Sequence, residues 1–182
     1  MMNYISLEKV LFIDIETVPM CASYDDLPER FIPLWDKKSS FLKKDELDTP
    51  ASLFGRAGIY AEFGKVVCIS FGMLLEGNFR IKSFFGDEES KVLGDFASLL
   101  ESRFSSRDFL LCAHNGKEFD FPYLSRRMLI NGIPLPEILD LAGKKPWEVA
   151  HLDTMELWKF GDFKNYTSLD LLAAVFDIPT PK

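Results

Sequence analysis

The sequence predicts an α/β fold in which helices flank a mixed five-stranded sheet. The 182 residues are 47% hydrophobic and 27% charged, a composition that is typical of one soluble globular domain with a full core. The first half of the chain contains three strand-like segments, of which the last two are joined by a tight turn. In the second half, helix-like and strand-like segments alternate, as they do where crossover helices join parallel strands.

The three strands of the first half are expected at residues 9–15, 65–75 and 79–85. The first is an almost continuous apolar run, which is typical of a strand that is buried on both faces. Gly77-Asn78 can form a tight turn between the other two strands, which makes them an antiparallel hairpin. Because this turn leaves no room for a helix, a flavodoxin-like sheet is not expected.

The later elements are predicted from helical spacing and capping residues. Asp87 is a suitable N-cap for a helix that reaches about residue 104, because apolar residues recur there along one face. Capping boxes that begin at Asp153 and Thr167 predict two short helices near the end of the chain. The remaining elements are expected at 109–113 (strand), 122–130 (helix) and 149–152 (strand).

The order of these elements is the connectivity expected of a ribonuclease H-like mixed sheet with strand order 3-2-1-4-5. We find no internal repeat or linker, so residues 1–182 are expected to form a single domain. Residues 19–64 are a long insertion after the first strand, and such insertions usually serve as functional lids or covers. We expect it to be partly helical, with Thr49-Pro50 at the start of a helix, to pack its aromatic residues onto the domain and to cover the site.

Charge restricts the class of partner. The chain carries 28 acidic and 21 basic residues, a formal net charge of -7, whereas proteins that hold nucleic acid through many phosphate contacts are usually basic. Any nucleic acid site is therefore expected to be small. No apolar run approaches the ~20 residues that span a bilayer, so we expect a cytoplasmic protein with no membrane partner. The three cysteines lack CxxC spacing and are expected to be small buried hydrophobes.

Asp14 and Glu16 are the strongest candidates for chemistry. They stand two apart on the first strand, so both carboxylates project from one face. Adjacent acids repel each other unless a proton or a cation neutralises them, and an oxygen-only ligand set favours Mg²⁺ or Mn²⁺ over zinc. Asp120 follows the fourth strand, which lies beside the first in this topology, so three acids would converge. Alternatively, Asp120 is only a helix N-cap, and Glu16 marks the end of a strand.

These acids lie within recognisable motifs. The segment Phe12-Ile-Asp-Ile-Glu-Thr17 resembles the first motif, Asp-x-Glu-Thr, of the DEDD (DnaQ-like) superfamily of 3′-to-5′ exonucleases. Asn115-Gly-Lys-Glu-Phe-Asp120 resembles its second motif. Residues 62–67 and 121–127 are most similar to the exonuclease domains of family B DNA polymerases and their stand-alone relatives. The resemblance extends over nearly the whole chain.

The resemblance implies a two-metal 3′-to-5′ exonuclease that hydrolyses phosphodiester bonds at the 3′ end of single-stranded DNA or RNA. It implies that Asp14 bridges two divalent cations, Mg²⁺ or Mn²⁺. It further implies that Glu16 binds the ion that activates water and that Asp120 helps to hold the second ion. Thr17 would lie near the terminal nucleotide, and Asn115 would support the second motif or the substrate strand.

The superfamily also has a fourth aspartate, in a motif Tyr-x-x-x-Asp or His-x-x-x-Asp on a late helix. Tyr166-Thr-Ser-Leu-Asp170 matches these letters. However, Thr167 is the expected N-cap, so Tyr166 precedes the helix and cannot share a face with Asp170. We therefore expect the C-terminal catalytic helix to be absent from this chain.

The other polar residues are expected to have structural roles. The capping box with Glu156 explains Asp153, and Asp162 is expected in a loop. Phe119 is expected to anchor the core rather than to stack on a base. The histidines His114 and His151 lack metal-ligand spacing, and basic pairs such as Arg126-Arg127 are expected on the solvated surface.

A second hypothesis comes from a different functional class. The missing fourth carboxylate and the negative charge are also compatible with a catalytically incomplete ribonuclease H-like module. Such a module would bind nucleic acid or a partner protein without cleaving it.

Overall fold

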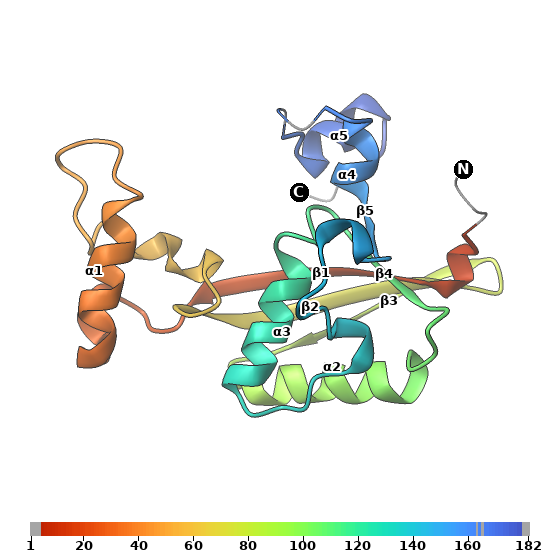
Figure 1. The fold of residues 1–182 in the computed structure, drawn as a ribbon, viewed down its shortest axis with the longest axis horizontal. Helices are drawn as coiled ribbons and strands as arrows, with labels where there is room; N and C mark the ends of the chain where they lie inside the picture. Colours follow the sequence, from red (N-terminus) through yellow and green to blue (C-terminus); the bar gives the residue numbers. More distant parts are fainter. Residues whose placement is uncertain (1–4, 163, 165, 180–182) are drawn as a thin grey trace.

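The structure, a computed structural model, describes residues 5–162, 164 and 166–179. Its centre is a five-stranded sheet of order β3-β2-β1-β4-β5 (Figure 1). The β1–β2 and β2–β3 pairs are antiparallel, and the β1–β4 and β4–β5 pairs are parallel. The predicted mixed sheet and its strand order are therefore confirmed. The strands are β1 (Val10–Pro19), β2 (Gly64–Leu75), β3 (Asn78–Phe85), β4 (Leu110–Ala113) and β5 (Leu152–Asp153).

Five α-helices accompany the sheet in the described residues. In the view of Figure 1, α2 lies below the sheet, and α4 and α5 lie together above it. The α-helices are α1 (Ile32–Ser40), α2 (Glu89–Arg103), α3 (Asp120–Ile130), α4 (Thr154–Lys159) and α5 (Leu169–Val175). Short 3-10 turns are η1 (Leu7–Lys9), η2 (Tyr24–Asp26), η3 (Glu29–Phe31), η4 (Phe54–Ile59), η5 (Glu137–Leu139) and η6 (Pro146–Glu148). None of the described helices is long and apolar enough to cross a membrane.

Two expected helix starts are displaced by polar contacts. The N-cap of α2 is Glu88 rather than Asp87, and the next residue, Glu89, turns inward to a buried ion pair with Arg127. The N-cap of α5 is Ser168 rather than the residue before it. Nε2 of His114 lies 2.9 Å from the Thr167 carbonyl oxygen and donates to it. This bond holds Thr167 outside the helix.

Two further element boundaries differ for local reasons. The helix α3 begins at Asp120, two residues earlier than expected, because the first turn of a helix has free N–H groups and so tolerates Pro122. The strand β5 begins only at Leu152. Before it, the Leu111 N–H donates to Nδ1 of His151 at 3.2 Å, so a side chain takes the place of strand pairing.

The strand β1 is buried on both faces only at its start, where Val10 and Leu11 are both fully buried, so the expectation of burial on both faces fails further along the strand. Leu11, Ile13 and Ile15 belong to the main core together with apolar residues of α2 and α3. The alternate residues Asp14 and Glu16 are exposed on the other face. The two helices cover only the first face, so the acids on the second face remain open to solvent.

The insertion between β1 and β2 has a small core of its own. Trp35 is fully buried, and its ring lies edge-on to Phe54 and Phe63. The aromatic residues of the insertion therefore pack mainly against one another rather than onto the main core, and Phe41 is 80% exposed. In Figure 1, α1 lies beyond the ends of β1 and β2.

The expected helix at Thr49-Pro50 is a turn that leads into η4. Thr49 Oγ1 accepts a hydrogen bond from the Ser52 N–H at 3.0 Å, and the Thr49 N–H donates to Ser52 Oγ at 2.9 Å. The root of the insertion is closed, because Pro19 pairs with Gly64 and the Met20 N–H donates to the Phe63 carbonyl at 2.8 Å.

We expect Trp35→Ala to open the insertion selectively. Replacing a buried aromatic residue with alanine costs about 3–5 kcal/mol, and this loss falls on the separate core of residues 19–64. Limited proteolysis should therefore cut within these residues at least about tenfold faster than in the wild type. Phe41→Ala is the matched control, because its ring is exposed, and equal cleavage of the two variants would contradict the separate core.

Candidate active site

The end of β4 brings Asp120 to β1. Parallel pairing between these strands stops at Phe12 and Cys112, so the N–H of Ile15 has no partner strand on that side. Because buried N–H groups require an acceptor, the Ile15 N–H must donate to a side-chain oxygen instead of to a neighbouring strand. Oδ1 of Asp120 accepts the bond at 3.2 Å. Asp120 is thereby fixed against the residue that lies between Asp14 and Glu16.

Asp120 is not an N-cap, so the alternative explanation for this residue is wrong. The N-cap of α3 is Phe119, which makes no side-chain capping bond, and Asp120 is the first helical residue. Its side chain turns to β1 instead. Phe119 is half-buried against the main core, with its ring centroid 5.3 Å from that of Tyr123, as expected for a core anchor.

The environment of Asp120 disfavours its charged form. The residue is only 4% exposed, and burial together with the nearby charge of Asp14 raises the pKa of Asp120 to about 7. Hydrogen bonds from backbone N–H groups oppose this shift without cancelling it. A cation placed beside these two acids would favour the charged form of Asp120.

The donor set fits a hard divalent cation. Asp14, Glu16 and Asp120 offer only carboxylate oxygens, which suit magnesium or manganese. Within the described residues, no group of three or more His, Cys, Asp or Glu side chains is already arranged to hold an ion.

Asp153 holds the loop that carries the second motif. Its Oδ1 accepts hydrogen bonds from the N–H groups of Asn115 and Met155, both at 2.9 Å, and its Oδ2 accepts one from Lys117 at 3.1 Å. Asp153 thus caps α4, as predicted. The reciprocal half of the predicted capping box is absent, because the Glu156 carboxylate binds the Lys117 ammonium at 2.8 Å.

Asn115 and Thr17, the two predicted substrate contacts, have different surroundings. Asn115 has a left-handed backbone, with φ of 63°, a conformation that Asn tolerates better than most residues. Its buried Oδ1 has no hydrogen-bond partner among the described residues. Thr17 is half-buried and follows a shift of register in β1.

The third-motif letters do not form a helical pair. Tyr166 precedes α5 and is 68% exposed, whereas Asp170 lies in the first turn of the helix. The expectation that they do not share a helix face is confirmed. Asp162 accepts a hydrogen bond from the Lys164 N–H at 3.0 Å within a loop, as expected.

The histidines have structural roles, as expected. Nδ1 of His114 lies 2.9 Å from Thr154 Oγ1, so its ring joins β4 to α4. His151 accepts from Leu111 and donates through Nε2 to the Ile138 carbonyl at 2.8 Å. Because burial lowers the pKa of His151, its neutral form is favoured.

The expectations for the basic pair and the cysteines hold only in part. Arg126 is exposed, but Arg127 is buried against Glu89, a partner that helical spacing did not predict.

Cys112 is buried, whereas Cys21 and Cys68 are half-buried, and all three are free thiols. Cys68 pairs with Glu16 across the strands, on the face that carries the exposed acids of β1.

Comparison with known families shows the family of this chain. Residues 59–181 match a family described as a predicted 3′-5′ exonuclease related to the exonuclease domain of PolB. The chain belongs to this family. The matched residues include Asp120, whereas β1 with Asp14 and Glu16 lies outside them.

Two solved structures are similar to this member of the family. The family B DNA polymerase of the hyperthermophilic archaeon Pyrobaculum calidifontis matches with a TM-score of 0.50 and 17% identity. The match covers 92% of this chain and only 18% of that polymerase. E. coli Exonuclease I in complex with a dT13 oligonucleotide matches with a TM-score of 0.43 and 10% identity, over 88% of this chain and 32% of Exonuclease I. No curated protein sequence matches. The polymerase match supports the fold.

We expect Asp120→Asn to stabilise the metal-free protein at neutral and higher pH. The folded state raises the pKa of Asp120 from 3.8 to about 7, so between these values the folded state binds more protons than the unfolded state. The wild type therefore loses stability as pH rises through this range. The amide keeps an acceptor for Ile15 and carries no charge, so the variant should be more stable near pH 8, by on the order of 3 kcal/mol.

Urea unfolding in EDTA from about pH 5 to about pH 8 measures this difference. It should grow as pH rises. Asp108→Asn, at an exposed aspartate, is the control and should show no such trend. A wild type that gains stability relative to Asp120→Asn as pH rises would contradict the burial of this acid.

Proposed function

We propose that this chain is a metal-dependent 3′-to-5′ exonuclease that acts on the end of single-stranded DNA or RNA. The observation that carries the proposal is the bond from Ile15 to Asp120, which places the second-motif acid against the strand that bears Asp14 and Glu16. Membership of the PolB-related exonuclease family supports the same reaction class.

The exposed acids of β1 and the buried acid of α3 are expected to have different roles. Asp14 and Glu16 offer carboxylates on the open face of β1, where an entering phosphate can approach. The Asp120 side chain is held toward β1 by the Ile15 N–H, which donates to its Oδ1. Asp14, Glu16 and Asp120 would hold Mg²⁺ or Mn²⁺ ions, with Asp14 serving both, and the ions would supply positive charge for the attacking and leaving oxygens of an in-line displacement.

Asn115 and Thr17 are proposed to hold the terminal nucleotide. The unpartnered Oδ1 of Asn115 is an acceptor that a donor group of the substrate would satisfy. Asp153 keeps this residue in its left-handed conformation through the bond to its N–H. The Thr17 side chain is partly accessible on β1 beside the acids.

The net charge of -7 is consistent with a reaction at a strand end. About two divalent cations would lower the negative charge to about -3 and would place positive charge where the phosphate binds. The protein would then hold few phosphates, and its affinity should depend on salt less steeply than that of proteins that contact many phosphates.

A non-cleaving module is the second candidate, and one observation favours it. Asp153, a buried acid that holds the second-motif loop, already accepts backbone hydrogen bonds on both carboxylate oxygens, which favours a structural role for it over that of a fourth ligand. Such a module would bind a nucleic acid end or a partner protein through the same face without hydrolysis.

We expect Asp14→Ala to lower exonuclease activity by at least about 100-fold, because it removes the proposed bridge between two cations. A 5′-labelled single-stranded oligonucleotide, in DNA and RNA forms, is incubated with the chain and either Mg²⁺ or Mn²⁺. The wild type should give a ladder that shortens from the 3′ end.

Glu101→Gln, at an exposed acid of α2, should leave the ladder unchanged. A wild type that binds the oligonucleotide but shortens it with neither metal would overturn the exonuclease and leave the non-cleaving module.

A further inference from the structure

One face of α3 carries a row of polar residues. Asp120, Tyr123, Arg127 and Asn131 follow one another at intervals of three or four, so they project from the same side of the helix. Asp120, Tyr123 and Arg127 are 4%, 2% and 7% exposed. Buried polar groups destabilise a fold unless they find partners, and each member of this α3 polar row has a partner on another element.

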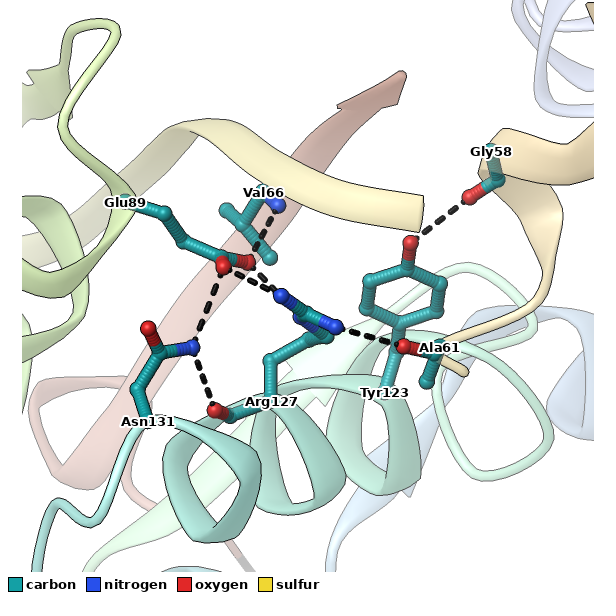
Figure 2. Close-up of polar contacts among 7 residues, drawn as sticks. All are labelled: Gly58, Ala61, Val66, Glu89, Tyr123, Arg127 and Asn131. Atoms are coloured by element: carbon teal, nitrogen blue, oxygen red, sulfur yellow. Dashed lines mark hydrogen bonds and ion pairs between the residues drawn. The ribbon is translucent and has the colours of Figure 1, made fainter. Parts of the chain in front are cut away.

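Figure 2 shows the partners of Tyr123, Arg127 and Asn131. The Tyr123 hydroxyl donates to the Gly58 carbonyl at 2.7 Å, and Nη1 of Arg127 donates to the Ala61 carbonyl at 2.8 Å. A side chain at Gly64 would collide with the Tyr123 hydroxyl. The root of the insertion is therefore attached to α3 by two bonds.

Glu89 is the shared hydrogen-bond partner of Arg127 and Asn131. The Arg127 guanidinium binds its carboxylate in a fork, from Nε at 2.8 Å and from Nη2 at 2.5 Å. The same carboxylate accepts from Asn131 Nδ2 at 3.0 Å and from the Val66 N–H at 2.7 Å. One acid thus joins α2, the start of β2 and α3.

This network acts on Asp120 through the helix. Arg127 lies two turns, or about 10 Å, beyond Asp120 along α3. A helix this short moves as one body, so a shift or rotation of the helix at Arg127 also moves Asp120. At its start, α3 is held to β1 by the bond from the Ile15 N–H to Asp120. The fork to Glu89 holds the helix near its other end, because a bidentate pair fixes direction as well as distance.

We propose that Arg127 is a positioning residue for the exonuclease reaction: its fork to Glu89 and its bond to Ala61 hold α3 so that Asp120 meets the Asp14–Glu16 segment of β1. This inference rests on the proposed function. According to this inference, Arg127 contributes to metal affinity although it is not itself a metal ligand.

Arg127→Lys is the decisive variant. Lysine keeps the buried positive charge for Glu89 but lacks the planar fork and the separate donor to Ala61. Residues that orient a metal ligand typically contribute about 10–100-fold to metal affinity or activity. We expect the Mn²⁺ dissociation constant of Arg127→Lys to rise at least about tenfold.

The Mn²⁺ dissociation constant is measured on the chain without substrate, from the electron paramagnetic resonance signal of free Mn²⁺. Activity is measured separately as kcat and KM for the oligonucleotide at one subsaturating Mn²⁺ concentration. We expect kcat to fall about tenfold and KM to change less than about twofold. Arg126→Lys, at the exposed neighbour on the same helix, is the matched control and should equal the wild type in all three quantities.

A lower melting temperature of Arg127→Lys with wild-type Mn²⁺ affinity and kcat would show a purely structural role and overturn the inference. If Arg127→Lys does not fold, Asn131→Ala takes its place, because it removes one donor to Glu89 and leaves the charges intact. It should weaken Mn²⁺ binding about threefold, and unchanged binding overturns the inference. A wild type that neither binds Mn²⁺ nor shortens the oligonucleotide instead defeats the exonuclease proposal, and the inference falls with it.

Discussion

The early end of β4 is the constraint on which the candidate site depends. Because β4 stops at Ala113 while β1 continues to Pro19, the far half of β1 has no neighbour on that side. The N–H of Ile15 then needs an acceptor, and the first residue of α3 supplies it. The same break leaves room for the Asn115 loop, which Asp153 holds from β5. The Asp120 carboxylate thus takes the place of a neighbouring strand, and its bond to Ile15 brings the second motif to the first.

The sheet and the acids could be predicted because their signals are local. Gly77-Asn78 marks a hairpin, alternating segments mark parallel strands, and residues 14 and 16 share a face through the period of a strand. Burial was harder to predict, because an apolar run does not show that helices cover only one side of it. Asp14 is therefore exposed, although its apolar neighbours predicted a buried strand.

The long-range polar contacts could not be predicted, because no local pattern links their members. Glu89 and Arg127 are 38 positions apart, and an acid near a helix start is commonly a cap or a solvated residue. Asp153 was correctly predicted as a cap, but its bonds to Asn115 and Lys117 depend on β4 and β5 being neighbours. Such residues become visible only once the topology brings the elements together.

The closed root of the insertion has a consequence for how this family can diversify. Pro19 pairs with Gly64, so the sheet requires only that β1 and β2 be joined as neighbours, and it places no demand on the length of the join. The α3 polar row holds only the last part of the insertion, at Gly58 and Ala61. Residues 20–53, which precede the turn η4 that contacts β1, can therefore change in length without separating β1 from β2, and such changes would alter the surface beside the proposed site while the acids on β1 stay in place.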